Sequence, residues 1–422
     1  MNTSLGFHTF TISKKLTTKE AEMLINDFKS YMEKTGEIAV FPIRKVRAPD
    51  DADGFTRWLY ANFSQYYVLH YTKQNKGIIW LLRCNDVSPG FIKPGEIDRP
   101  CSIKATINPK ILTGGSNYLA AATSADLKAA KPLFSAEAKK ISPVLGTYSH
   151  YKMNRPDYCV NFDLNELGIP CTPEQMIYLI KHADIPWRYL EREKYDDISK
   201  RKKTDKNNFY LESKSVTINC YGKEAQLRKK FPDCPDLEAS RNVIRFEVQC
   251  NYLKTYSLLK KVASEPGTTN SDAIQTMLSE DYCDEIIRDY FNRVIHRGDY
   301  FTLDGAIREV KRNHFQRRKE ERLIGGLRRI NQYRGIHRVK AALQAEELNI
   351  FRRTLSDLAE INVNPVTIPR EWNIPRIPNL LDAYDRSTDE ARSKKRLEEA
   401  GDEILKEYFK DRKRKSKHRN WL

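Results

Sequence analysis

The residue with the clearest chemical potential is Tyr221, near the end of a strand-like stretch at residues 215–223. Polar and apolar residues alternate strictly over this stretch, so the Tyr221 hydroxyl falls on the polar face of a half-buried strand, and Lys223 on the same face. A tyrosine hydroxyl, with an ordinary pKa of about 10, is a weak nucleophile. Lys223 could lower that pKa or neutralise a phosphate. We therefore predict that Tyr221 attacks a DNA phosphodiester and that Lys223 assists it.

Two further strand-like stretches, residues 154–164 and 242–250, carry carboxylates on their polar faces: Asp157 and Asp163 on the first, Glu247 on the second. If the three strands are neighbours in one antiparallel sheet, these carboxylates converge on Tyr221. Hard oxygen ligands suit Mg²⁺ or Mn²⁺, which we predict as the cofactor. Such an ion would polarise the scissile phosphate and offset charge developing on its oxygens.

Each of these residues also has a structural interpretation. Carboxylates on strands are commonly solvated or paired with an arginine, and Arg245 lies beside Glu247 in the sequence. Tyr221 could be a packed aromatic of the sheet, and Tyr210, on a preceding strand, is a competing nucleophile. Tyr252 and Tyr256 begin a helix and could be core residues or residues that stack on DNA bases.

The composition indicates an anionic partner. The net charge is +17 over 422 residues and the isoelectric point is about 9.3, an excess of Lys and Arg typical of nucleic-acid-binding proteins. The alternative is a basic protein with solvated Lys-rich faces. The side chains that we predict to contact DNA are Arg201, Lys202, Lys203, Arg245, Arg328, Arg329, Arg352 and Arg353.

The cysteines, the N-terminus and the hydropathy indicate in which cellular compartment the protein is found. The eight cysteines form no C-x-x-C pair, and those in strand-like runs are typical of small buried residues in a reducing compartment. No signal-peptide core and no apolar run of membrane-spanning length occurs. We therefore predict a cytoplasmic protein with no membrane partner. No G-x-x-x-x-G-K-[ST] motif occurs, so no ATP site is expected.

The periodicity predicts an α+β protein in four segments. Residues 1–95 form an N-terminal α+β segment, and residues 96–265 form a catalytic domain with an antiparallel sheet. Residues 266–386 form a helical DNA-binding region, either a helix-turn-helix reader or a helical packing domain. Residues 387–422 form a basic flexible tail that grips phosphates. Pro132 is expected to bend or interrupt a helix over residues 124–141.

Four segments in order carry a family resemblance: PCSIKATINPKILTGG at 100–115, NRPD at 154–157, NCYGKE at 219–224 and PDLEASRNVIRFEV at 235–248. Together they resemble the gene II replication initiators of filamentous phages and the related rolling-circle initiators of phages and plasmids. The resemblance covers roughly residues 97–260. It implies a metal-dependent enzyme that nicks one strand of origin DNA, stays linked to the 5′ phosphate through tyrosine, and later rejoins the strand. It also implies a host helicase and polymerase as partners.

Within that resemblance, Tyr221 matches the nucleophile, and Asp157 and Glu247 match the carboxylate strands. Two features depart from the family pattern. Pro156 replaces an aliphatic residue, and the His-x-His metal pair of many nicking initiators is absent. Metal coordination is therefore expected to be mostly by carboxylates, with His150 either an added ligand or a surface residue. The alternatives are a relaxase for conjugative transfer and a non-catalytic origin-binding protein of the same fold.

Overall fold

The computed structural model describes residues 2–42, 64–71, 75–85, 101–115, 119–184, 207–264, 267–391 and 393. They group into two compact units: residues 1–163 with 172–296, and residues 164–171 with 297–422. The first unit is a mixed helix and sheet unit and the second is mostly helical, so the α+β prediction is confirmed. In the described part of the chain, no helix combines the length and the apolar character needed to cross a bilayer.

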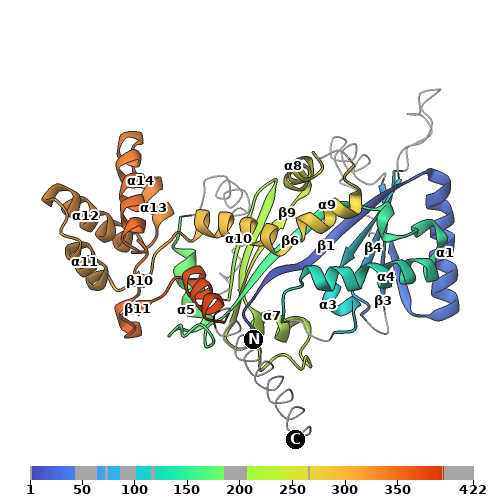
Figure 1. The fold of residues 1–422 in the computed structure, drawn as a ribbon, viewed down its shortest axis with the longest axis horizontal. Coiled ribbons are helices and arrows are strands. Elements are labelled where there is room, and N and C mark those ends of the chain that lie inside the picture. Colours follow the sequence, from blue (N-terminus) through green and yellow to red (C-terminus); the bar gives the residue numbers. More distant parts are fainter. Residues whose placement is uncertain are drawn as a thin grey trace, which may run out of the picture. The chain divides into compact units, whose positions relative to one another are not determined.

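The first unit is built on a nine-stranded antiparallel sheet with the order β2-β3-β4-β5-β1-β6-β9-β8-β7 (Figure 1). Its strands are β1 (Ser4–Leu16), β2 (Ile38–Pro42), β3 (Ser64–Tyr71), β4 (Ile78–Asn85), β5 (Cys101–Ile107), β6 (Lys152–Asp163), β7 (Asn208–Glu212), β8 (Val216–Gly222) and β9 (Val243–Cys250). Its helices are α1 (Thr18–Thr35), α3 (Pro109–Leu112), α4 (Ser124–Ile141), α5 (Pro173–Lys181), α7 (Lys223–Lys230), α8 (Tyr252–Val262), α9 (Asn270–Met277) and α10 (Glu280–Val294), with 3₁₀ turns at Pro143–Leu145 and Tyr148–His150.

The sheet consists of two halves with similar connectivity, the first having, among the described residues, one more returning strand than the second. In the first half, strand β1 is followed by helix α1, and β2 to β5 then return as a meander whose last strand pairs with β1. In the second half, β6 is followed by α5, and β7 to β9 return so that β9 pairs with β6. The antiparallel pair of β1 and β6 joins the halves at the centre. The segment boundary predicted at residue 95 falls between β4 and β5, which are paired in this one sheet.

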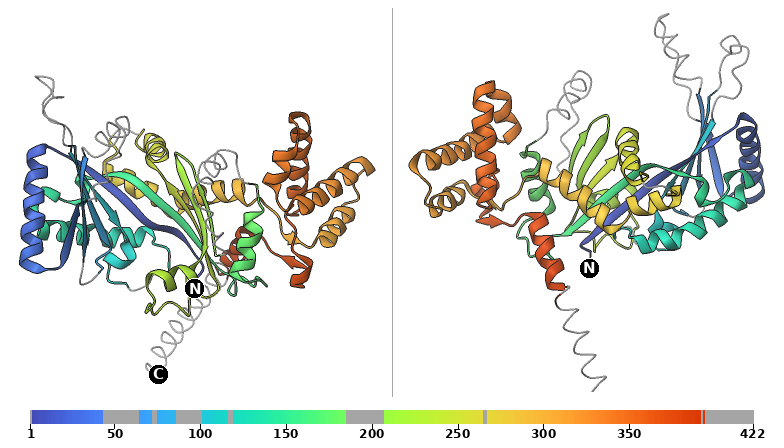
Figure 2. Two further views of the ribbon diagram at one scale, coloured as in Figure 1. Left: turned by 180° about the vertical axis from the view of Figure 1, so that it is seen from behind. Right: turned by 45° about the horizontal axis from the view of Figure 1, so that its top comes forward.

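One face of the sheet is apolar because the strands alternate. Helices α8, α9 and α10 pack on β6, and α10 also contacts β1 and β9 (Figures 1 and 2). Phe291 of α10 lies against Phe162 of β6 and Phe246 of β9, with ring centroids 5.9 and 5.3 Å apart. In the first half, Trp80 of β4 packs against Phe134 of α4 at 5.2 Å. The opposite face carries polar residues of β1, β5, β6, β8 and β9 and is where the predicted site lies.

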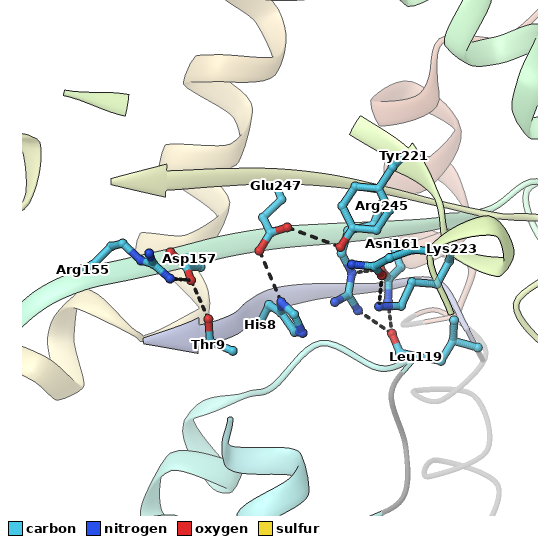
Figure 3. Close-up of polar contacts among 11 residues, drawn as sticks. His8, Thr9, Leu119, Arg155, Asp157, Asn161, Tyr221, Lys223, Arg245 and Glu247 are labelled. Carbon is cyan, nitrogen blue, oxygen red and sulfur yellow. Dashed lines mark hydrogen bonds and ion pairs between the residues drawn. The ribbon is translucent and has the colours of Figure 1, made fainter. Parts of the chain in front are cut away.

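A β-bulge in β1 changes which side chains reach that polar face. Phe7 pairs with Tyr158 and Thr9 with Asp157, so His8 is an extra residue on β1. Phe7 and Phe10 both lie in the core, three residues apart, with ring centroids at 5.9 Å. Strict alternation would place His8 in the core beside Phe10, but the bulge turns it to the polar face instead (Figure 3).

Helix starts and prolines in the first unit follow the sequence closely. Thr17 and Thr172 form capping boxes at the starts of α1 and α5. Helix α4 continues through Pro132 without ending there. Of the two predicted effects of Pro132, an interruption is therefore wrong, and a bend stays a prediction. Strand β6 accommodates Pro156 opposite Phe10.

The second unit is a small helical bundle with a two-stranded sheet. Its elements are β10 (Tyr300–Phe301), α11 (Leu303–Arg312), α12 (Arg317–Tyr333), α13 (Ile336–Ala342), α14 (Ala345–Glu360), a 3₁₀ turn at Arg370–Trp372 and β11 (Arg376–Ile377). The core joins α11, α12 and α14 through Val310, Leu323, Leu327 and Leu358. A Cβ on Gly326 would come within 2.6 Å of Thr354, so glycine allows α12 and α14 to approach closely.

Candidate nucleophile and carboxylate site

The strands that carry Tyr221, Glu247 and Asp157 are neighbours, as predicted. Strand β9 lies between β8 and β6 and pairs with both in antiparallel register. Glu247 stands opposite Asn219 on one side and Cys159 on the other, while Gln249 stands opposite Asp157. Because residues in register share a face, the three polar rows form one surface. Figure 3 shows these side chains on the same side of β6 and β9.

The Tyr221 hydroxyl donates a hydrogen bond to Oε2 of Glu247 at 3.3 Å. The Tyr221 side chain is only 4% exposed. Burial first, and then the negative charge of Glu247, raise the pKa of Tyr221 well above its ordinary value. Tyr221 therefore points at the predicted carboxylate, but in this arrangement it is a protonated and covered hydroxyl.

Lys223 is buried at the start of α7. Its Nζ donates to Oε1 of Gln226 at 2.9 Å and lies 5.9 Å from the Tyr221 ring centroid. Because the net effect of the surroundings is to raise the pKa of Tyr221, the activation expected from Lys223 is not achieved here. Its other predicted role, neutralising a phosphate, stays a prediction.

His8 is the site residue that the sequence analysis missed. Its Nδ1 lies 3.3 Å from Oε1 of Glu247, so Glu247 is held between His8 and Tyr221. Burial lowers the pKa of His8 to about 4, so the ring is neutral at pH 7 and donates from Nδ1. Burial alone would raise the pKa of Glu247, but the His8 hydrogen bond and the charges of Arg245 and Lys223 lower it to about 2. The only sequence signal for this placement is the three-residue spacing of Phe7 and Phe10.

Asp157 lies two residues along β6 from the partner of Glu247. Its Oδ2 accepts hydrogen bonds from Thr9 Oγ1 at 2.5 Å and from Arg155 at 2.8 Å. Its Oδ1 is buried with no hydrogen-bond partner among the described residues. Burial raises the pKa of Asp157 and Arg155 opposes this, but the charge of Glu247 adds to the burial effect, giving a pKa of about 6. Asp157 is therefore a buried carboxyl group that offers one oxygen to a ligand.

Arg245 is wholly buried, which contradicts its predicted contact with DNA. Its Nε donates to Oδ1 of Asn161 at 2.7 Å, and one Nη donates to the backbone carbonyl of Leu119 at 2.6 Å (Figure 3). Asn161 donates to the same carbonyl. The guanidinium thus fastens the segment at Leu119 to the polar face and lowers the pKa of Glu247 at short range. The sequence could not show this because the covering segment is distant in the chain.

Asp163 does not join the predicted metal site. It stands opposite Val243, and its Oδ2 accepts from Asn2 at 2.9 Å. It lies six residues beyond Asp157, which corresponds to roughly 20 Å along a strand. The prediction that Asp163 helps to hold the ion is therefore wrong on geometric grounds.

The donor chemistry fits a divalent ion only in part. Asp157 and Glu247 supply carboxylate oxygens, and His8 adds an imidazole on the same face. Within the ranges that the structure describes, no three His, Cys, Asp or Glu side chains form a group able to hold a metal ion. Further buried polar atoms on this face have no partner among the described residues, namely Asn208 Oδ1, Asn219 Oδ1 and Arg245 Nη1. Such atoms are what an incoming polar ligand would satisfy.

The competing nucleophile, Tyr210, is the more accessible of the two tyrosines. It lies on the edge strand β7 opposite Asn219, in the same row as Glu247. Its side chain is 51% exposed, and its hydroxyl donates to Glu212 at 3.3 Å. His150, by contrast, is exposed and bonded to Thr147 away from this cluster, in agreement with a surface role.

The other predicted DNA contacts divide into two groups. Arg328 and Arg329 on α12 and Arg352 and Arg353 on α14 are exposed in the helical unit. Nη1 of Arg329 lies 3.6 Å from Oε1 of Glu347. Arg201, Lys202 and Lys203, and the basic end of the tail, lie outside the described residues.

Comparisons with known proteins found no matching family model, no matching curated protein and no matching solved structure. The resemblance to the phage and plasmid replication initiators therefore stays a prediction that depends on the four quoted segments.

Proposed function

We propose that this chain is a metal-dependent DNA-nicking enzyme that starts rolling-circle replication, with Tyr221 as its nucleophile. The observation that carries the proposal is the Tyr221 hydroxyl bonded to Glu247, on the face where Asp157 holds an unpartnered oxygen. The net charge of +17 supports a polyanionic substrate. The exposed arginines of α12 and α14 would contribute non-specific phosphate contacts.

In the proposed reaction the Tyr221 oxygen attacks a phosphorus atom of one DNA strand. A tyrosine–phosphate ester forms with the 5′ phosphate, the bond to the 3′ oxygen breaks, and that oxygen leaves as a 3′ hydroxyl. The Tyr221 proton passes to the Glu247 carboxylate, whose other oxygen is held by His8, and from there to the departing 3′ oxygen. Rejoining is the reverse transfer, so no ATP is required. Mg²⁺ or Mn²⁺, held by Asp157 and Glu247, would supply charge neutralisation at the phosphate.

Burial sets one condition on this chemistry. Tyr221 is 4% exposed, so the side chains that cover the polar face must move before a DNA strand can reach it. The segment at Leu119 is held there by Arg245 and Asn161 and is the cover that we expect to open. Opening would also reduce the burial that raises the pKa of Tyr221.

The test is the formation of a covalent adduct. The protein is incubated with a pool of random-sequence single-stranded oligonucleotides labelled at the 3′ end, with Mn²⁺, and resolved on a denaturing gel. Labelled protein is expected for the wild type and for Tyr210→Phe, and the adduct is expected to fall at least roughly 1,000-fold in Tyr221→Phe, because no other hydroxyl replaces the nucleophile. EDTA is expected to abolish the adduct.

Three results would contradict parts of the proposal. An adduct that survives Tyr221→Phe and disappears in Tyr210→Phe moves the nucleophile to the exposed edge strand. An adduct that forms in EDTA removes the metal. Binding without any adduct leaves a non-catalytic nucleic-acid-binding protein, the alternative that the burial and raised pKa of Tyr221 favour.

A further inference from the structure

Helix α8 presents a basic and aromatic ridge to solvent. The exposed positions repeat in two rows along the helix, and they are Tyr252, Leu253, Tyr256, Ser257, Lys260 and Lys261. We call these six residues the α8 ridge. The opposite side of the helix is anchored by buried Thr255 and Leu258. Thr255 Oγ1 donates to the carbonyl of Cys250 at 2.8 Å.

The aromatic residues of the ridge are unusually exposed. Tyr252 is 65% exposed, Leu253 59% and Tyr256 50%. The rings of Tyr252 and Tyr256 are nearly parallel, with an interplanar angle of 21° and centroids 6.3 Å apart. Both therefore present their faces in the same orientation one helical turn apart, which excludes the core role that the sequence left open.

The charge of the ridge has one sign. Lys260 Nζ lies 4.9 Å above the Tyr256 ring, at the end of the row that the two tyrosines begin. Lys254 and Lys261 also lie on α8, and the helix contains no acidic residue. A row of parallel rings that ends in lysines matches a ligand with flat π faces joined by a negatively charged chain.

We propose that the α8 ridge is a stacking platform for single-stranded nucleic acid. Bases in a duplex are already stacked on one another, so only an unpaired strand can lay its bases on Tyr252 and Tyr256. Lys260 and Lys261 bind the phosphates that connect those bases. A single residue, Asn251, separates β9 from α8, and Gln249 near the end of β9 stands opposite Asp157. The ridge therefore starts near the end of β9 that pairs with Asp157, but α8 lies with α10 on the apolar face of the sheet and not on the face that carries the candidate site.

This inference takes its ligand class, nucleic acid, from the proposed function, but it does not require that the protein cleaves DNA. Binding is measured without cleavage, by fluorescence anisotropy of a labelled oligothymidylate in EDTA with the full-length protein. Tyr252→Ala and Tyr256→Ala are each expected to weaken binding roughly 5- to 100-fold. Tyr256→Phe keeps the π face and is expected to stay within about twofold. Alanine is a strong helix former, so α8 should remain folded.

A matched control and a second readout separate stacking from charge. Tyr178→Ala removes a tyrosine that is 39% exposed on α5 and is expected to leave binding unchanged. Lys260→Gln is expected to reduce the slope of log affinity against log salt by about 0.7, whereas the tyrosine variants keep the slope.

The inference is overturned if both alanine variants bind the oligothymidylate like the wild type. It is also overturned if they change self-association in sedimentation experiments and not DNA binding, since the ridge would then be a protein contact. The wild-type protein separates the two proposals. If its binding of oligothymidylate depends on Tyr252 and Tyr256 but it forms no covalent adduct, the nicking proposal fails while the ridge proposal holds.

Discussion

The two halves of the sheet have similar connectivity but differ in how far their polar faces are buried. In the first half, Thr11 of β1 and Thr106 of β5 share a hydroxyl hydrogen bond of 2.9 Å. Lys104 beside them is half-buried, and burial, with Arg83 and Arg155 nearby, lowers its pKa. In the second half, the polar face holds Asp157, Glu247, Arg245 and Tyr221, each at most 4% exposed.

This difference shows that the strand pattern alone does not make a reactive site. Both halves expose a polar row on the same side of the sheet, but in the second half a distant segment at Leu119 lies on that row. Burial then separates the two carboxyl groups, raising the pKa of Asp157 to about 6 while neighbouring donors lower that of Glu247 to about 2. Carboxyl groups with separated pKa values are typical of catalytic sites.

The largest expected difference between the halves is in stability. Arg245→Met leaves Asn161 Oδ1 without its donor, removes one of the donors to the Leu119 carbonyl and leaves the buried Glu247 without the charge of Arg245, and is expected to lower the free energy of unfolding by about 3–5 kcal/mol. Lys104→Met in the first half is expected to cost about 1 kcal/mol or less. Urea denaturation measures both. If both variants lose the same free energy of unfolding, the buried charge of Arg245 does not stabilise the second half more than Lys104 stabilises the first.

The next expected effect is a pH dependence of opposite sign for two neighbouring residues. The folded state raises the pKa of Asp157 from 3.8 to about 6, so the stability that its protonation contributes is lost as pH rises through that window. The folded state lowers the pKa of His8 from 6.5 to about 4, so its contribution is lost as pH falls. The free energy by which the wild type exceeds Asp157→Asn should therefore decrease between pH 4.5 and 6, on the order of 2 kcal/mol.

The same urea series with His8→Gln should show the reverse slope, an advantage of the wild type that grows with pH. Glu247 is present in the wild type and in both variants, so its own contribution to the pH dependence is common to the stabilities being compared. Parallel slopes for the two variants would contradict the assignment of burial as the main cause of both shifts.

The smallest expected effect is the difference in stability cost between substitutions of two threonines on the same strand. Thr9 donates to the buried carboxyl group of Asp157, whereas Thr11 is bonded to the Thr106 hydroxyl. Thr9→Val is expected to cost about 1.5–3 kcal/mol, because hydrogen bonds to charged groups are the stronger class, and Thr11→Val about 0.5–1 kcal/mol. Chemical denaturation at pH 7 distinguishes them. If Thr11→Val is the costlier change, the hydrogen bonds on the polar face of the first half contribute more to stability than those of the second half, which contradicts the comparison.

Much of the scaffold was predictable because it depends on local pattern. Alternation over the strands of Asp157, Tyr221 and Glu247 placed each on a polar face, whereas their pairing as antiparallel neighbours was an assumption that the observed register bears out. The wide separation of Asp163 from Asp157 was also implicit in the sequence, since six residues of strand cannot be bridged by one ion.

The remaining features depended on contacts that no local pattern encodes. The bulge that turns His8 to Glu247 follows from the packing of Phe7 and Phe10 in one core, and alternation alone assigns His8 to the wrong face. The carbonyl that holds the Arg245 guanidinium belongs to Leu119, which lies 126 residues away in the chain. The sequence by itself therefore determined which residues of one strand share a face, except at the bulge. Only the tertiary structure decided which of them are buried, and burial in a low dielectric is what shifts their pKa values and their reactivity.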